Sequence, residues 1–249
     1  MINLENVSKT FNTGKPNQVN AVEGVSLQIN SGEFVVIVGA NGSGKTTLLN
    51  LVAGNTLSQG GKILIENTDV TRLPEYDRTK WIARIFQNPL LGTASELSII
   101  DNFRLAALRT RRKGLSIGKN DAFKEQVRQK VASLRMGLEN KLEQPIGTLS
   151  GGQRQALTLL MSVMDECKIL LLDEPTAALD PKSAVNVMAI ADNLIKENNL
   201  TAVLITHNLR DAINYGTRVI QMSEGKVIRD IAGEEKAKIN QNELFSWFD

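Results

Sequence analysis

The sequence predicts an α/β domain with a largely parallel sheet and an inserted helical lobe, on three observations. Short, continuously apolar runs such as residues 34–38 and 169–172 are typical of strands buried on both faces of a parallel sheet. Helical patterns separate these runs, which favours the strand–helix alternation of α/β folds. From about residue 98 to residue 165 the pattern is helical throughout, so we expect this stretch to form a lobe within one domain over residues 1–249.

The expected elements follow one another along the chain in strand–helix order. Before the lobe, strands are expected at residues 2–7, 25–29, 34–38, 62–65 and 81–86, and a helix at 45–53. In the lobe, Ser98 is the expected N-cap of a helix whose apolar residues recur at helical spacing, with further helices at 121–134 and after Gly152. After the lobe, strands are expected at 169–172, 201–206 and 218–222, with a helix at 182–196.

Composition and charge exclude several classes of protein. A net charge of +2 gives no strong field, so we expect no nucleic-acid partner. The single cysteine, Cys167, excludes an internal disulfide framework and a cysteine-rich zinc site. No apolar run reaches the length of about 18 residues that a membrane-spanning helix needs. Any membrane role of this chain is therefore expected to depend on partner proteins.

A glycine-rich segment lies between the expected strand at 34–38 and the expected helix at 45–53. Residues 39–46, with the sequence GANGSGKT, match the P-loop pattern without a mismatch. The glycines let successive backbone N–H groups point at one anion, and the helix N-terminus adds its dipole. We expect Lys45 to reach the β- and γ-phosphates and the Thr46 hydroxyl to ligate Mg²⁺. The residues expected to bind the nucleotide here are Gly39, Asn41, Gly42, Ser43, Gly44, Lys45, Thr46 and Thr47.

Two acids end the apolar run at 169–172. Asp173 and Glu174 stand at the carboxyl end of a buried strand, where ligands bind in open α/β sheets. We expect Asp173 to hold Mg²⁺ directly or through water, and Glu174 to orient or deprotonate the attacking water. An apolar run ending in two acids is common, so this interpretation depends on the glycine-rich segment upstream.

A third motif between these two sites gives the family resemblance. Residues 149–153 read LSGGQ and are followed by Arg154 and Gln155. With the P-loop and the two acids in this order, the chain resembles the ABC ATPase family over about residues 1–230. The resemblance implies a P-loop NTPase with a RecA-like, mostly parallel core, an antiparallel β lobe and a helical lobe. It also implies ATP hydrolysis by a homodimer, or a heterodimer with a similar ATPase, that encloses two ATP molecules.

Further site residues are assigned by the same resemblance. The segment Ser150, Gly151, Gly152 and Gln153 has the character of an anion site at a helix N-terminus, and in the family it completes the ATP site of the opposite subunit. The loop containing Asp180 is similar to the one that crosses to that subunit.

Three more positions match family motifs at the ends of expected strands. Gln87 is similar to the glutamine that reaches Mg²⁺ and senses the membrane partner. His207, the only histidine, corresponds to the residue that hydrogen-bonds the γ-phosphate and the attacking water. Phe11 stands where the family places an adenine-stacking aromatic, and its alternative is a core residue of the β lobe.

The resemblance implies a subunit that powers an ABC transporter. Residues 86–102 and 155–161 are similar to importers of amino acids, including tryptophan or tyrosine. The implied partners are transmembrane permease subunits and an extracytoplasmic substrate-binding protein, which places this chain at the cytoplasmic face of the inner membrane. An ATPase of iron–sulfur cluster assembly in the same family is the alternative. A plain P-loop kinase would lack the loop at 150–153.

Two surface features remain open at this stage. The basic residues 109–113 are expected either to be solvated at a helix end or to contact anionic headgroups or a partner loop. Residues 244–248 are expected to form a helix that packs on its own domain, and the alternative is a contact site for a partner protein.

Overall fold

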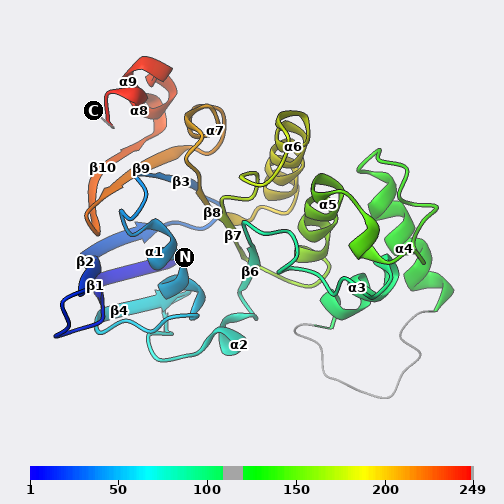
Figure 1. The fold of residues 1–249 in the computed structure, drawn as a ribbon, viewed down its shortest axis with the longest axis horizontal. Coiled ribbons are helices and arrows are strands. Elements are labelled where there is room, and N and C mark those ends of the chain that lie inside the picture. Colours follow the sequence, from blue (N-terminus) through cyan, green and yellow to red (C-terminus); the bar gives the residue numbers. More distant parts are fainter. Residues whose placement is uncertain (109–119, 248–249) are drawn as a thin grey trace.

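The protein is described here by a computed structural model that covers residues 1–108 and 120–247. Two sheets and a group of helices make up the molecule, with the helices α3, α4 and α5 on one side and both sheets on the other (Figure 1). The basic segment at 109–113 and Phe248 lie outside the described residues.

The first sheet is antiparallel throughout. Its strand order is β2-β1-β4-β5, and each neighbouring pair runs antiparallel. Its strands are β1 (Ile2–Phe11), β2 (Val19–Ile29), β4 (Gly60–Ile65) and β5 (Thr68–Asp69). Residues 8–11 of β1 and 19–20 of β2 are half-buried or exposed and form no apolar run, so both strands extend beyond their expected limits. This sheet is the expected antiparallel β lobe.

The second sheet is parallel except at one edge. Its order is β10-β9-β3-β8-β7-β6, and only the β10–β9 pair is antiparallel. Every residue of the strands β3, β7 and β8 is buried, which explains why all but Asp173 at the end of β7 and Thr201 at the start of β8 are apolar. The strands are β3 (Phe34–Val38), β6 (Ile82–Ile85), β7 (Ile169–Asp173), β8 (Thr201–Ile205), β9 (Arg218–Ser223) and β10 (Lys226–Ala232). The expected α/β class with a mostly parallel core is confirmed.

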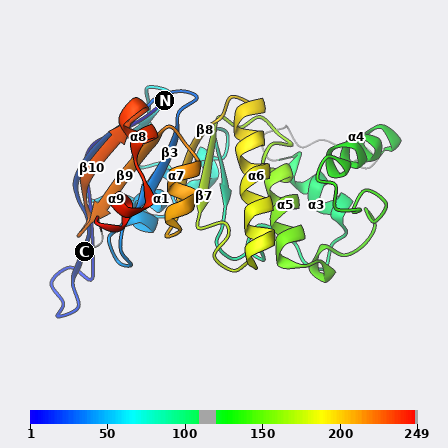
Figure 2. The same cartoon turned by 90° about the horizontal axis from the view of Figure 1, so that it is seen from above.

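The helices cover the sheet and form the lobe. Ser98 caps α3 as expected, since its side chain accepts a hydrogen bond from the backbone N–H of Asp101. Figure 2 shows α6 between α5 and the strands β7 and β8, and α5 also contacts β6 directly. The helices are α1 (Lys45–Ala53), α2 (Glu75–Arg78), α3 (Ile99–Ala106), α4 (Asp121–Ala132), α5 (Gly151–Ser162), α6 (Pro181–Glu197), α7 (Leu209–Asn214), α8 (Gly233–Lys238) and α9 (Gln241–Phe245), with a 3-10 turn at Ile146–Thr148.

The C-terminal helix packs on its own domain, as expected. Leu244 is fully buried, and the Trp247 carbonyl accepts a hydrogen bond from Gln221 Nε2 at 2.6 Å. The strand β10 was not expected, because it is an edge strand without a buried residue and has no apolar pattern. Across residues 1–108 and 120–247, none of the helices combines the length and apolar character needed to cross a bilayer.

Candidate functional site

The glycine-rich loop joins β3 to α1 and needs glycine for two physical reasons. Gly44 has a φ of 101°, and a Cβ there would lie 2.2 Å from the carbonyl oxygen of Ala21. A Cβ on Gly39 would lie 2.3 Å from the carbonyl oxygen of Met222. Gly42 has a φ of 79° in open space, where the backbone conformation alone favours glycine. Glycine at positions 39 and 44 therefore allows the loop to pack against the backbone of Met222 and Ala21.

Lys45 lies at the centre of this loop. Its side chain is buried, and Nζ donates hydrogen bonds to the carbonyl oxygens of Gly39 at 2.8 Å and Ala40 at 2.9 Å. Burial lowers the pKa of the ammonium group, while the negative charges of Glu174 and Asp173 act in the opposite direction. The N-terminus of α1 and this ammonium group together form a site for an anionic group.

Asp173 is held by groups from two sides. Its Oδ1 accepts a hydrogen bond from the Thr46 hydroxyl at 3.3 Å, and its Oδ2 lies 2.7 Å from Arg84 Nη2 in a largely buried ion pair. Arg84 also donates from Nη1 to the side-chain oxygens of Asn50 at 2.7 Å and Asn55 at 2.8 Å. Sequence reasoning missed Arg84. The available signal was a single charge in the otherwise apolar strand at 82–85.

Glu174 meets two of the predicted site residues. Its Oε2 accepts a hydrogen bond from Gln87 Nε2 at 3.3 Å and lies 3.2 Å from His207 Nδ1. Glu174 has a φ of 47°, a conformation that is unfavourable for a non-glycine residue, and its backbone N–H donates to the Ile205 carbonyl at 3.0 Å. Neighbouring parallel strands therefore fix the side chain that the sequence suggests as the base.

The oxygen donors near the loop fit Mg²⁺. The Thr46 hydroxyl, the Asp173 carboxylate and the Gln87 amide oxygen are hard ligands of the kind that Mg²⁺ prefers. Within the described part of the chain, no group of three or more His, Cys, Asp or Glu side chains could hold a metal ion by itself. Mg²⁺ commonly keeps waters and binds substrate phosphates along with one or two carboxylates, so the sparse donor set agrees with a shared site.

The segment Ser150–Gln153 lies beside the loop that contains Asp180. Ser150 Oγ accepts from the Gln153 N–H, and Gln153 Oε1 accepts from the Ser150 N–H, which is a capping box at the start of α5. A Cβ on Gly151 would lie 3.1 Å from a side-chain carbon of Leu179, and one on Gly152 would lie 2.7 Å from Ser183. These small residues allow α5 to pack closely on α6 and the loop before it.

Asp180 caps the neighbouring helix α6. Its Oδ1 accepts a hydrogen bond from the Ser183 N–H at 3.1 Å. Hydrogen bonds from the side chain and the backbone of Ser183 lower the pKa of this carboxyl. Ser150 and Asp180 are both exposed, so both helix N-termini are open to a further molecule.

Phe11 stands at the end of β1. Its side chain is 39% exposed, and Lys9 Nζ lies 5.3 Å from the ring centroid, which contradicts the alternative of a core residue. Phe11 pairs with Val19 on β2, two residues before Ala21, whose carbonyl oxygen adjoins Gly44. The strand pairing thus places Phe11 near the loop without showing a contact with it. Thr47 is half-buried in the first turn of α1.

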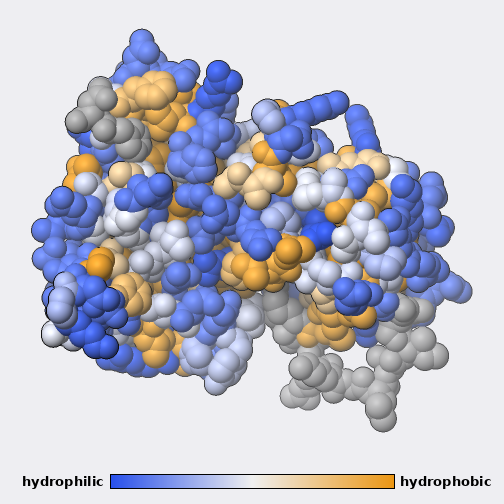
Figure 3. Space-filling view, in the orientation of Figure 1, coloured by the Kyte–Doolittle hydropathy of each residue, from blue (hydrophilic) through white to orange (hydrophobic). Residues whose placement is uncertain are grey.

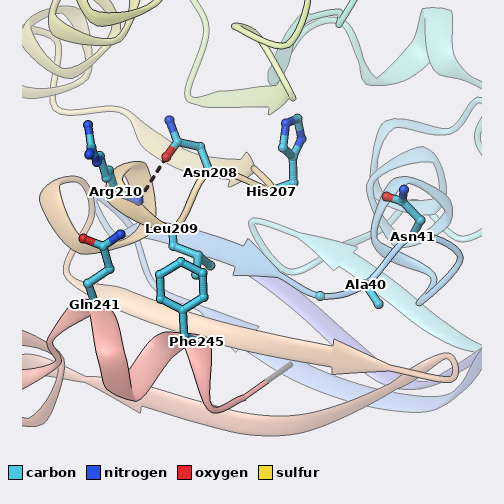
Figure 4. Close-up of a pocket in the computed structure, with 9 residues that line it drawn as sticks. Ala40, Asn41, His207, Asn208, Leu209, Arg210, Gln241 and Phe245 are labelled. Atoms are coloured by element: carbon cyan, nitrogen blue, oxygen red, sulfur yellow. Dashed lines mark hydrogen bonds between the residues drawn. The ribbon is translucent and has the colours of Figure 1, made fainter. Parts of the chain in front are cut away.

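A pocket of about 630 Å³ adjoins the loop (Figure 4). In the close-up Asn41 lies to the right and Arg210 to the left, His207 lies between them, and the C-terminal helix α9 supplies the lower wall. Sequence reasoning missed this wall, because α9 is about 200 residues away from the loop in the sequence. The lining residues are Gly39, Ala40, Asn41, His207, Asn208, Leu209, Arg210, Gln241 and Phe245.

Comparison with known proteins gives a consistent result. The ABC transporter family profile matches residues 22–177. The chain is 38% identical to a tyrosine transport ATP-binding protein of Clostridioides difficile, over 100% of this chain and 99% of that protein. It is 32% identical to a phosphonates import ATP-binding protein of Lactococcus lactis, over 98% of each chain.

A solved structure agrees with the sequence comparisons. It is a dimeric ATP-binding cassette in a post-hydrolysis state with bound ADP and phosphate. Its TM-score with this chain is 0.79 at 28% identity, over 93% of this chain and 98% of the other.

Proposed function

Because the chain belongs to the ABC transporter family of ATP-binding proteins, we propose that it powers an importer of aromatic amino acids. It is an ATP-hydrolysing subunit of an ABC transporter, so the iron–sulfur assembly alternative is set aside. The proposal of substrate class is carried by the 38% identity to a tyrosine transport protein, which extends over nearly the whole of both chains. The phosphonates import relative is less similar, at 32%.

The phosphates of ATP would lie on the glycine-rich loop. The N-terminus of α1 and the buried Lys45 ammonium supply the positive potential that the triphosphate needs. Thr46, Asp173 and Gln87 are the donors that would hold Mg²⁺, which when bound neutralises phosphate charge. The Thr46–Asp173 hydrogen bond keeps two of these donors together before the ligand arrives.

Glu174 would be the general base. Gln87 and His207 both contact Oε2, so Oε1 is the carboxylate oxygen that can face an attacking water. The two contacts restrict rotation of the carboxylate, which is what positioning of a base requires. The strained backbone of Glu174 supports a role that depends on one fixed geometry.

The exposed ends of α5 and α6 suit a second subunit. ABC ATPase cassettes work as dimers with membrane-spanning permease partners. In our proposal Ser150, Gly151, Gly152 and Gln153 contact the ATP of the opposite subunit, and the Asp180 loop crosses the interface. The second subunit is another copy of this chain or a similar ATPase.

The permease would contact the segment that follows Gln87. Leu90 and Leu91 are 51% and 66% exposed, and Figure 3 shows apolar surface near the centre of the face where Figure 1 places the connection from β6 to α3. Exposed apolar groups beside a catalytic glutamine suit a protein partner. In this arrangement the chain works at the cytoplasmic face of the membrane, and a substrate-binding protein outside delivers the amino acid.

Uptake by cells that lack this gene tests the proposal. Uptake of labelled tyrosine and tryptophan should fall and return with the wild-type gene but not with a Lys45→Ala gene, which produces the protein without its phosphate-binding cation. Uptake of a labelled alkylphosphonate serves as the contrast. Loss of phosphonate uptake with unchanged amino-acid uptake would replace aromatic amino acids by phosphonates as the proposed substrate and leave the ATPase assignment intact.

A further inference from the structure

Gln155 joins the helical lobe to both catalytic segments of the core. It lies on α5 and is fully buried, and its Nε2 donates hydrogen bonds to the carbonyl oxygens of Phe86 at 3.1 Å and Pro175 at 3.0 Å. Phe86 directly precedes Gln87, and Pro175 directly follows Glu174. One amide group therefore holds the backbone next to each member of the Gln87–Glu174 hydrogen bond.

A second contact fixes the same segment to α5. A Cβ on Gly92 would lie 2.7 Å from Thr158 Cγ2, so the chain after Gln87 runs directly against this helix. Gln155 and Thr158 are three residues apart and share one side of α5. The Gln87 segment is thus attached to α5 by hydrogen bonding at one point and by close packing at the other.

The bonding of Gln155 favours a polar role over simple filling of space. Its Oε1 is buried without a hydrogen-bond partner among the described residues. Burying an unpaired amide oxygen is unfavourable, and an apolar side chain of similar size would avoid it. The favourable contribution of Gln155 therefore comes from the two N–H groups of Nε2, which hold the carbonyl oxygens of Phe86 and Pro175.

We propose that Gln155 is a positioning residue that holds Gln87 and Glu174 in contact and links their geometry to the position of the helical lobe. The proposal rests on the catalytic roles assigned above to those two residues. Ser150 caps the same helix, so a displacement of the helix moves Ser150 and Gln155 together. Contact of the Ser150 segment with a second subunit is thereby connected to the Gln87–Glu174 pair.

Steady-state kinetics of Gln155→Leu test the proposal. The turnover number should fall by about 10²-fold, the loss that a displacement of about 1 Å at a reacting group can cause. The dissociation constant for ATP should stay at the wild-type value, because the phosphate-binding loop makes no hydrogen bond with Gln155. Gln155→Met provides a second, more adaptable replacement if the leucine variant does not fold. A parallel loss of ATP affinity and turnover would indicate a general structural role and overturn the proposal.

Ser162→Ala is the matched control on the same helix. Ser162 is also buried, and its hydroxyl donates to the Leu159 carbonyl within α5, away from both catalytic segments. Its turnover number should equal that of the wild type.

A double-mutant cycle with Gln87→Ala separates this proposal from the assigned functions. If Gln155 acts through the Gln87 segment, the double variant should be no slower than the slower single variant. Losses that multiply would overturn the proposal. Full activity of Gln155→Leu beside inactive Glu174→Gln would also overturn it and leave the proposed function standing. Full activity of both Gln155→Leu and Glu174→Gln would overturn the proposal and also remove the assigned role of Glu174.

Discussion

At the residue scale, the proposed role of Glu174 as general base depends on which of its carboxylate oxygens can face the attacking water. Gln87 and His207 approach the same oxygen, and the backbone N–H of Glu174 is held by the neighbouring strand. The Arg84–Asp173 ion pair provides comparable order for the carboxylate that we propose as an Mg²⁺ ligand. Both carboxylates are thus held in place by protein groups, which reduces the reorganisation needed when substrate binds.

Replacing Glu174 by glutamine should separate binding from hydrolysis. The change keeps the size of the side chain but removes the proton acceptor, so turnover should fall at least about 100-fold. ATP binding should persist, since Lys45, Thr46 and Asp173 are unchanged. Gel filtration should show an ATP-dependent shift from monomer to dimer that ADP does not produce. Hydrolysis within about threefold of the wild-type rate would rule out Glu174 as the base and make His207 the next candidate.

Lys45→Ala should abolish tight ATP binding, because the triphosphate loses the cation at the centre of the loop. Isothermal titration calorimetry measures the affinity directly. Lys236→Ala is the matched control, since Lys236 is also a buried lysine whose pKa is lowered by burial and whose Nζ donates to two carbonyls, those of Ile213 and Tyr215. The control should lose stability and keep its ATP affinity. Wild-type affinity in Lys45→Ala would refute the assignment of the loop.

At the scale of elements, the end of α1 is stabilised by a cation from α2. Arg78 is fully buried and donates from Nη1 to the carbonyl oxygens of Leu51 at 2.7 Å and Val52 at 2.9 Å. Burial lowers its pKa to about 10, so the side chain stays charged at neutral pH. A cation at a helix C-terminus satisfies unpaired carbonyls and interacts favourably with the helix dipole. Helix α1 begins at the glycine-rich loop, and Arg78 holds its C-terminal end in place.

Arg78→Met should lower the free energy of unfolding by at least about 2 kcal/mol, because buried carbonyl oxygens lose their donors. Urea denaturation followed by circular dichroism gives this value. Arg72→Met is the control: Arg72 is exposed and donates to the Ser58 carbonyl, and its loss should change stability by no more than about 0.5 kcal/mol. Equal effects of the two substitutions would show that the burial of Arg78 has no special importance.

At the scale of the whole molecule, one apolar core joins the lobe to the parallel sheet. Buried residues of α3, α4 and α5 belong to the same cluster as those of β3, β7 and β8. The second cluster lies between the two sheets and contains α1. The glycine-rich loop leads into α1, which belongs to the second cluster, whereas the Ser150 segment leads into α5, which belongs to the first. The two segments are therefore in different parts of the molecule, which agrees with a site completed by a second subunit.

Ser150→Arg should block dimer formation and hydrolysis while the monomer still binds ATP. The arginine adds bulk at the exposed N-terminus of α5 and removes a cap worth about 1 kcal/mol, so folding should persist. ATP affinity of the monomer and gel filtration in the Glu174→Gln background measure the two effects. Ser133→Arg is the control, because Ser133 is the exposed C-cap of α4 in the same lobe. This variant should dimerise normally. Loss of ATP binding by the Ser150→Arg monomer would place this segment in the site of its own subunit.

The sequence by itself determined the elements whose pattern is local. The strand β3 and the helix α1 have the bounds expected from a buried apolar run and a glycine-rich loop, and Ser98 caps α3 through a bond three residues away. The positions of Asp173 and Glu174 at a strand end were also readable, because the run before them is continuously apolar. Such features depend on neighbouring residues alone.

Only the tertiary structure decided which groups meet across the molecule. Arg84 and Asp173 are 89 positions apart, and their ion pair exists because β6 lies next to β7 in the sheet. Gln155 reaches Phe86 and Pro175 because α5 packs over the ends of those same strands, and α9 reaches the pocket beside Asn41 from the end of the chain. No periodicity encodes these contacts. They follow from the strand order and from the burial of shared apolar surfaces, which bring distant segments together only when the whole chain folds.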